Sequence, residues 1–282
     1  MAVINQIKTI LLLGILTAVL LFIGSLFGPT GLTIAIIFVV AMNMITYFFS
    51  HKIVLVMYRA KEAKKSDYPK LHKIVEDLAK KANIPKPKIY TIPTENLNAF
   101  ATGNNPKNGV VACTEGILKL LDYKELEGVL AHEISHIKNR DILITTIAAT
   151  IGGIISYIAM IARFGAIFGG DRDRSSGNIL VLLALSILAP LAAIIIQLAI
   201  SRTREYQADA SGASLIKDGK HLATALEKLH SHNKTHPMGF GNPATSSLFI
   251  VNPFDTRSFF ITLFSTHPPY NKRTERLRAM KF

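Results

Sequence analysis

Cysteine and tryptophan are the rarest residues of this chain: Cys113 is its one cysteine, and tryptophan is absent. A lone thiol excludes an internal disulfide and a metal site built from several cysteines. Charged residues are also scarce, at 18% against 49% hydrophobic residues, and the mean hydropathy is +0.32. This composition is too apolar for an ordinary soluble protein and indicates a membrane protein.

Acidic residues are fewer than basic ones, with 19 Asp and Glu against 32 Lys and Arg, and the net charge is +13. Such a surplus suits either nucleic acid or the surface of an anionic bilayer. The sequence has no arginine-rich tract and no basic motif interleaved with aromatic residues. We therefore expect a lipid bilayer as a partner and no nucleic acid.

Charge is absent altogether from four apolar runs, which we interpret as transmembrane spans. Each is about 20 residues long, enough to cross the hydrocarbon core of a bilayer as a helix. The segment Gly28-Pro29-Thr30-Gly31 separates the first two and predicts a tight helical hairpin. The runs lie at about residues 9–27, 32–50, 142–162 and 179–200.

A cleaved signal peptide is the rival interpretation of the first run. The run is too long for one, and Ala-x-Ala cleavage chemistry is missing at its end. For the second hairpin, which contains Pro190, a segment in the plane of the membrane or an incomplete span stays open as an alternative.

The loop after the first hairpin determines the expected orientation. Residues 52–81 carry nine Lys and Arg against four acids, so the positive-inside rule places them in the cytoplasm. Two further crossings bring the chain back, so both termini are expected there as well. The expected parts are residues 1–51, 52–141, 142–200 and 201–282.

Short elements are expected in the two cytoplasmic parts. Residues 69–82 have the apolar spacing of an amphipathic helix, and so do residues 222–229. Three short strands separated by Pro, Asn and Gly suggest a small sheet, whose edge strand could hold a peptide in extended form. They are expected at 88–92, 98–102 and 110–113, with a long loop at 236–266 and a last basic helix at 273–280.

The segment Ala131-His132-Glu133-Ile134-Ser135-His136 reads H-E-x-x-H. On a helix, His132 and His136 lie on one face and can bind one zinc ion, and Glu133 can act on water at the metal. Asp122 and Glu125 have the spacing of a capping box, and no Gly or Pro interrupts residues 129–151. One helix is therefore expected to run from about Tyr123 into the third apolar run. Two surface histidines on a helix are the alternative.

A catalytic zinc site needs a third protein ligand, and Glu205 is the best candidate. Glu205 and Asp209 lie four residues apart, so Asp209 can support a ligand histidine on the same helical face. Both Glu205 and His136 lie within about 9 Å of the membrane end of an apolar run, at 1.5 Å per helical residue. Alternatively, Glu205 pairs with Arg202 or Arg204 on an exposed helix.

Together these features resemble the HtpX-type heat-shock metalloproteases, relatives of the CAAX prenyl proteases among the glutamate-zincins. The resemblance covers essentially the whole chain, including the order of spans and motifs. It is carried by four stretches, Asn98-Ala99-Phe100-Ala101-Thr102-Gly103, Ala131–His136, Ser201–Asp209 and Ser265-Thr266-His267-Pro268-Pro269.

The resemblance implies one zinc ion per chain, held by His132, His136 and Glu205, with Glu133 as general base. It also implies that Asp209 supports a ligand histidine, and we expect Arg202 beside it. The strand formed by Asn98, Ala99, Phe100 and Ala101 is expected to bind substrate, with a strand-end turn as the alternative for Asn98. His267 is expected near the active site as a catalytic residue, although a histidine before Pro-Pro also suits a plain turn.

The expected fold is a mainly α integral membrane protein, with four transmembrane helices and a zincin-like α+β catalytic part. The expected function is zinc-dependent hydrolysis of peptide bonds in damaged or misfolded membrane proteins, on the cytoplasmic side of the inner membrane, under stress. A CAAX-type processing enzyme normally has more spans. A scaffold with a structural zinc would need a fourth ligand. A transporter would need ionisable residues inside the spans.

Overall fold

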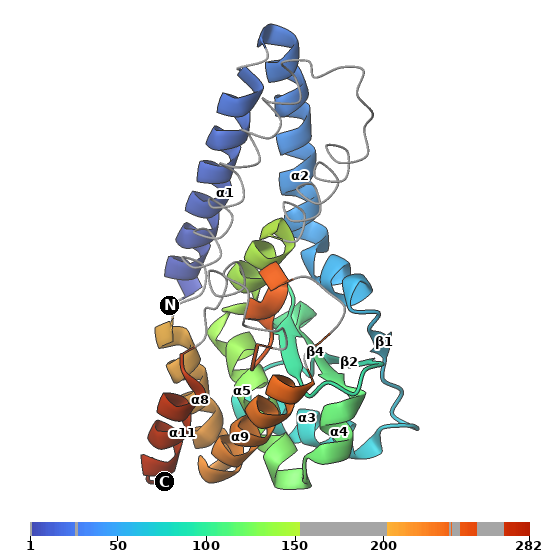
Figure 1. Cartoon of the computed structure of the whole chain (residues 1–282), viewed down its shortest axis with the longest axis vertical. Helices are drawn as coiled ribbons and strands as arrows, with labels where there is room; N and C mark the ends of the chain where they lie inside the picture. Colours follow the sequence, from blue (N-terminus) through green and yellow to red (C-terminus); the bar gives the residue numbers. More distant parts are fainter. Residues whose placement is uncertain (1, 26–27, 153–201, 237, 239–242, 253–267) are drawn as a thin grey trace.

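Two long helices form a hairpin that projects from the rest of the molecule (Figure 1). The computed structural model describes residues 2–25, 28–152, 202–236, 238, 243–252 and 268–282. The hairpin pairs α1, Ala2–Ser25, with α2, Gly28–Met57. The expected turn at Gly28 to Gly31 is wrong by a few residues. Gly28, at φ +75°, already begins α2, and Pro29 lies in the first turn, where its missing N–H removes no helical bond.

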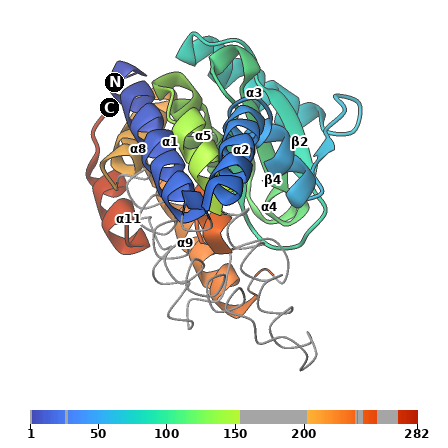
Figure 2. The same cartoon turned by 90° about the horizontal axis from the view of Figure 1, so that it is seen from above.

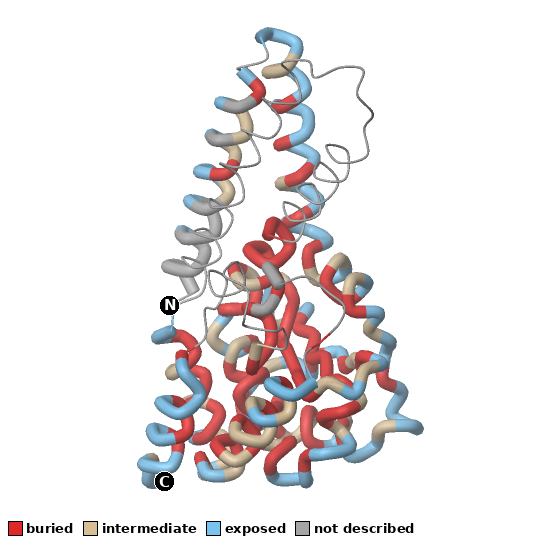
Figure 3. Tube along the Cα trace, viewed as in Figure 1, coloured by how far each residue is buried: buried red, intermediate tan, exposed pale blue. Residues whose placement is uncertain are grey.

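Helix α2 exposes apolar side chains along most of its length (Figure 3). On α2, Ile34, Ile37 and Val40 are each more than half exposed. Among the described residues α2 is the one helix long and apolar enough to cross a membrane, and 17% of its most apolar window is buried. Of the expected second hairpin, residues 142–152 are helical. Its remainder and the loop before residue 201 lie outside the described residues.

A four-stranded mixed sheet lies at the base of the hairpin, in the order β1-β2-β4-β3. β2 runs parallel to β4, whereas β1 and β3 run antiparallel to their neighbours. The prediction is confirmed to the residue for β2 and to within one residue at the ends of β3 and β4. The bounds are β1 Lys61–Glu62, β2 Lys88–Ile92, β3 Ala99–Thr102 and β4 Val110–Thr114.

Helix α5 lies between the sheet and α8, with α11 farther out beside α8 (Figure 2). The predicted helix at residues 69–82 is confirmed as α3, whose buried side chains Leu71, Ile74, Val75 and Leu78 join the main core. The remaining bounds are α3 Pro69–Ala82, η1 Pro106–Asn108, α4 Glu115–Leu120, α5 Tyr123–Asn139, α8 Arg202–Ile216, α9 Lys220–Thr235, η2 Pro243–Leu248 and α11 Tyr270–Ala279.

Helix α5 begins as predicted but ends earlier. The Asp122 side chain and Glu125 form the expected capping box. The expected continuation into the third apolar run is wrong, because Arg140 adopts a left-handed conformation at φ +59°. The main-chain N–H of Arg140 and that of Asp141 then bond back to the last turn, at Ile137 and His136. This closes α5 and turns the chain before residue 142.

Candidate metal centre

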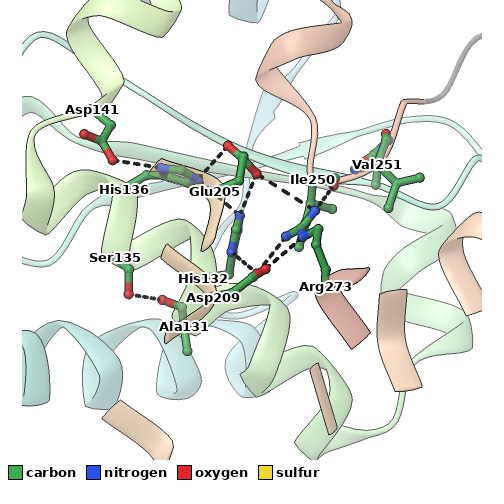
Figure 4. A network of polar contacts seen from close by, with 11 residues as sticks. Ala131, His132, Ser135, His136, Asp141, Glu205, Asp209, Ile250, Val251 and Arg273 are labelled. Atoms are coloured by element: carbon green, nitrogen blue, oxygen red, sulfur yellow. Dashed lines mark hydrogen bonds and ion pairs between the residues drawn. The ribbon is translucent and has the colours of Figure 1, made fainter. Parts of the chain in front are cut away.

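Helix α5 presents His132 and His136 one turn apart on the face that packs against α8. The side chain of His132 is 1% exposed and that of His136 is 13% exposed. Glu205 lies in the first turn of α8 and points at both rings (Figure 4). The alternative of two surface histidines, and that of Glu205 on an exposed helix, therefore do not describe this protein.

Three side-chain groups converge on one point. The Nε2 atoms of His132 and His136 are 3.1 Å apart. Glu205 Oε2 lies 3.7 Å from His132 Nε2, and Glu205 Oε1 lies 3.5 Å from His136 Nε2. Ligands that surround a tetrahedral zinc ion at about 2.0–2.1 Å are separated by roughly 3.3 Å. The donor types and their spacing thus fit a zinc ion with one position left open.

The other nitrogen of each ring faces a carboxylate. His132 Nδ1 lies 2.9 Å from Asp209 Oδ1, and His136 Nδ1 lies 3.2 Å from Asp141 Oδ2. A carboxylate at Nδ1 favours the tautomer with its proton there and leaves the Nε2 lone pair for a metal. Asp209 was expected in this place. Asp141 was missed, although its position five residues after His136, next to the end of the helix, was a usable signal.

The sequence interpretation also missed Arg273, a buried residue of α11. Its guanidinium binds both oxygens of Asp209, at 2.9 and 2.7 Å. Nothing in the sequence distinguished it from the other basic residues of that helix. Arg202, which was expected beside the site, is exposed at the start of α8. His267 lies outside the described residues.

Glu133 is buried beside the candidate ligands, with 2% of its surface exposed. Burial, reinforced by the negative charge of Glu205, raises the pKa of Glu133 to about 7. The positive charge of His136 opposes the shift, and so does a main-chain hydrogen bond with Ala101 of β3. A carboxylate with a pKa near neutrality can both take up and release a proton, as a general base must.

The strand β3 borders the same site, since Ala101 lines one pocket with His132, Glu133, His136 and Glu205. The start of its open edge is already paired within the chain. The main-chain N–H of Ile250 donates to the Ala99 carbonyl at 3.2 Å. The side-chain amide of Asn98 donates to the Val251 carbonyl at 2.6 Å.

Phe100, the next residue of β3, packs against Tyr58 and Phe249. Its ring therefore belongs to the core and not to the pocket.

Comparison with known proteins supports the family that the sequence motifs resemble. Residues 65–281 match the profile of peptidase family M48. A protease HtpX homolog of Persephonella marina is 53% identical over 281 residues, covering 98% of this chain and 97% of the relative. Another, from Syntrophobacter fumaroxidans, is 48% identical and covers 98% of this chain and 99% of the relative. A third, from Pyrococcus abyssi, is 52% identical and covers 97% and 95%.

The fold is also similar to that of a solved structure. The crystal structure of S. mikatae Ste24p aligns with a TM-score of 0.52 at 20% identity, covering 98% of this chain and 66% of that one. At this identity the likeness concerns the fold alone. The sequence relatives, by contrast, match almost from end to end at about half identity. The chain therefore belongs to peptidase family M48 and, within it, to the HtpX-type metalloproteases.

Proposed function

We propose that this metalloprotease is a membrane-bound zinc endopeptidase that cleaves damaged or misfolded membrane proteins on the cytoplasmic side of the inner membrane. The observation that carries the proposal is the convergence of two imidazole nitrogens and one carboxylate beside the buried Glu133. Such a set, with one position open, is typical of a catalytic zinc site.

In this proposal His132, His136 and Glu205 hold the zinc ion. When bound, zinc activates a water molecule and polarises the carbonyl of the scissile peptide bond. Asp209 and Asp141 hold the two rings from behind, at 2.9 and 3.2 Å, so that both Nε2 atoms stay turned toward the metal.

Glu133 is the proposed general base. Its carboxylate accepts a proton from the attacking water and afterwards returns it to the leaving amine. Its burial supports both steps, because a raised pKa makes the protonated carboxyl a usable acid at neutral pH. The hydrogen bond with Ala101 holds the carboxylate beside the strand on which the substrate is proposed to lie.

The proposed substrate is a peptide in extended form that pairs with the Ala101 end of the strand formed by Asn98, Ala99, Phe100 and Ala101. Because Ile250 already pairs with Ala99, the proposed peptide begins at the Ala101 end of the edge. His267 remains a proposed catalytic residue that donates a hydrogen bond to the developing oxyanion. Arg202, exposed at the start of α8, is proposed to act on the site only through its positive charge.

The proposed membrane location is supported by the exposed apolar faces of α1 and α2. Bare apolar surface of this extent needs a lipid or protein cover. We extend the proposal to four spans, with the second hairpin within residues 142–200, and to cytoplasmic termini on the strength of the basic residues at 52–81.

The test compares the purified full-length protein with its Glu133→Gln variant in detergent micelles. Zinc content is measured by metal analysis, and proteolysis is measured on casein. The expected outcome is about one zinc per chain in both proteins and loss of at least about a hundredfold in the cleavage rate of the variant. Cleavage by the variant at the wild-type rate would exclude Glu133 as the base.

A matched control is Glu127→Gln, on the same helix. Glu127 lies 3.5 Å from Lys81 at the surface of the domain, away from the candidate ligands. The Glu127→Gln variant should retain both its zinc and its proteolytic activity. A wild-type protein that cleaves casein without zinc, and equally well in a chelator, would overturn the proposed metal.

A further inference from the structure

Arg273 is the largest fully buried side chain among the described residues, with 2% of its surface exposed. A guanidinium removed from water destabilises a fold unless charged and polar partners satisfy it. Here they come from three directions: the Asp209 carboxylate on α8, the Glu205 carboxylate of the same helix, whose Oε2 lies 3.9 Å from Arg273 Nη1, and the main-chain carbonyl of Ile250 (Figure 4).

The contact with Asp209 is a two-bonded fork. Arg273 Nε donates to Asp209 Oδ2 at 2.9 Å, and Nη2 donates to Oδ1 at 2.7 Å. Two parallel bonds between planar groups determine the orientation of the carboxylate, which a single bond does not. Lysine cannot reproduce this geometry, because its ammonium is a point charge.

The oriented oxygen is the one that faces a candidate metal ligand. Asp209 Oδ1, which accepts from Arg273, also lies 2.9 Å from His132 Nδ1. Three helices are thereby connected in series: α11 through Arg273, α8 through Asp209 and α5 through His132. A shift of the Arg273 guanidinium would therefore move the Asp209 carboxylate and, through it, the His132 ring.

The third contact extends this series to the edge of the sheet. Arg273 Nη1 donates to the Ile250 carbonyl at 2.8 Å. The main-chain N–H of Ile250 in turn donates to the Ala99 carbonyl of β3. One side chain therefore holds both the carboxylate behind His132 and the segment that covers the start of β3.

We infer that Arg273 is a positioning residue of the metal site, which orients Asp209 toward His132 while it fastens residues 250–251 over the start of β3. The inference rests on the proposed metal site. Its alternative is a buried ion pair that stabilises the fold and has no influence on the metal.

The test uses full-length protein in detergent micelles and two probes, Zn²⁺ and Co²⁺. Zn²⁺ affinity is measured by competition with a chromophoric chelator. Co²⁺ is then substituted, and its visible absorption spectrum reports the ligand geometry. For Arg273→Gln we expect a loss of Zn²⁺ affinity on the order of tenfold to a hundredfold, as for other partners of metal-bound histidines. The Co²⁺ bands should also shift.

Asp209→Asn should weaken Zn²⁺ binding to a similar degree. The double variant should be little worse than the weaker-binding single variant, because both substitutions break the same series of contacts. Arg278→Gln is the matched control: Arg278 lies on the same helix and pairs with Glu227 at the surface. It should leave the affinity and the spectrum unchanged.

Arg273→Lys covers the case in which Arg273→Gln does not fold, since it retains the charge. A Zn²⁺ affinity and Co²⁺ spectrum equal to wild type in any folded Arg273 variant would overturn the inference, even if its melting temperature falls. Failure of the proposed function would look different, because the wild-type protein itself would then not bind Zn²⁺.

Discussion

Gly212 of α8 lies directly against His132 of α5. A Cβ atom at Gly212 would be 2.8 Å from the His132 main-chain nitrogen and 2.9 Å from the Ala131 carbonyl carbon. Both are closer than the roughly 3.5–4.0 Å at which non-bonded heavy atoms attract one another. The absence of a side chain is therefore what lets α8 bring Glu205 and Asp209 to the two histidines.

Gly212→Ala is expected to separate the two helices. Overpacking costs about 1–3 kcal/mol, which exceeds the roughly 1 kcal/mol that alanine adds to helix stability. We expect a lower melting temperature and weaker Zn²⁺ binding, measured by chelator competition. Ser211→Ala, one residue earlier, is the control and should change neither. Unaltered Zn²⁺ affinity in Gly212→Ala would contradict this account of the helix contact.

Asp141→Asn is expected to weaken metal binding through His136. The carboxylate lies 3.2 Å from His136 Nδ1, and its replacement by an amide removes the charge that favours the proton there. We predict a loss of Zn²⁺ affinity on the order of tenfold, read by the same competition. Asp218→Asn is a matched control, because Asp218 makes a similar contact with His221 at 3.0 Å outside the site. Equal Zn²⁺ affinities for the two variants would show that Asp141 does not support the metal site.

Zn²⁺ binding is expected to weaken as the pH falls. Burial lowers the pKa of His132 to about 4. Burial also lowers that of His136, but Asp141 and the charges of Glu205 and Glu133 prevail and raise it to about 9. The metal-free pair thus holds one proton at neutral pH, which the metal must displace, since a ligand imidazole is neutral.

The affinity should therefore drop about tenfold for each pH unit below about 9, and more steeply below about 4, where His132 also takes up a proton. Calorimetry in buffers of different ionisation enthalpy would count the protons released. An affinity that is constant from pH 9 to about pH 6 would show that the pair is already neutral without metal.

Val40→Lys tests the membrane assignment of α2. Val40 lies near the centre of the expected span 32–50 and is 56% exposed, and a lysine at the centre of a span costs about 3 kcal/mol on insertion scales. We expect part of the protein to be extracted from membranes by alkaline carbonate. Leu120→Lys is the control, because Leu120 is an exposed apolar residue of α4 in the catalytic part. If both variants stay equally membrane-bound, α2 does not need its apolar face.

The local elements could be predicted from the sequence where a local pattern determines them. Apolar spacing defined α3, and Pro87 and Pro93 bounded β2. The end of α5 could not be predicted, because Arg140 is neither Gly nor Pro, although its left-handed conformation lets two main-chain N–H groups bond back to the last turn. A run without helix breakers was therefore a poor guide to the length of the helix.

The candidate metal ligands could be predicted because two of them share one helical turn and the third follows an apolar run. Their supporting residues were harder to predict. Asp209 shares a helix with Glu205 and follows from its spacing, whereas Arg273 lies 64 residues farther along the chain. Only the burial of its own side chain distinguishes it from Arg276 and Arg278, which are exposed on the same helix. Arg202, which was expected beside the site, is exposed as well.

The corner at Arg140 has a mechanical consequence. Asp141 is the second residue beyond α5 and the last before the helix at 142–152, yet its carboxylate lies 3.2 Å from His136 Nδ1. A change in the angle between those two helices would therefore move a carboxylate that lies one contact from a candidate metal ligand.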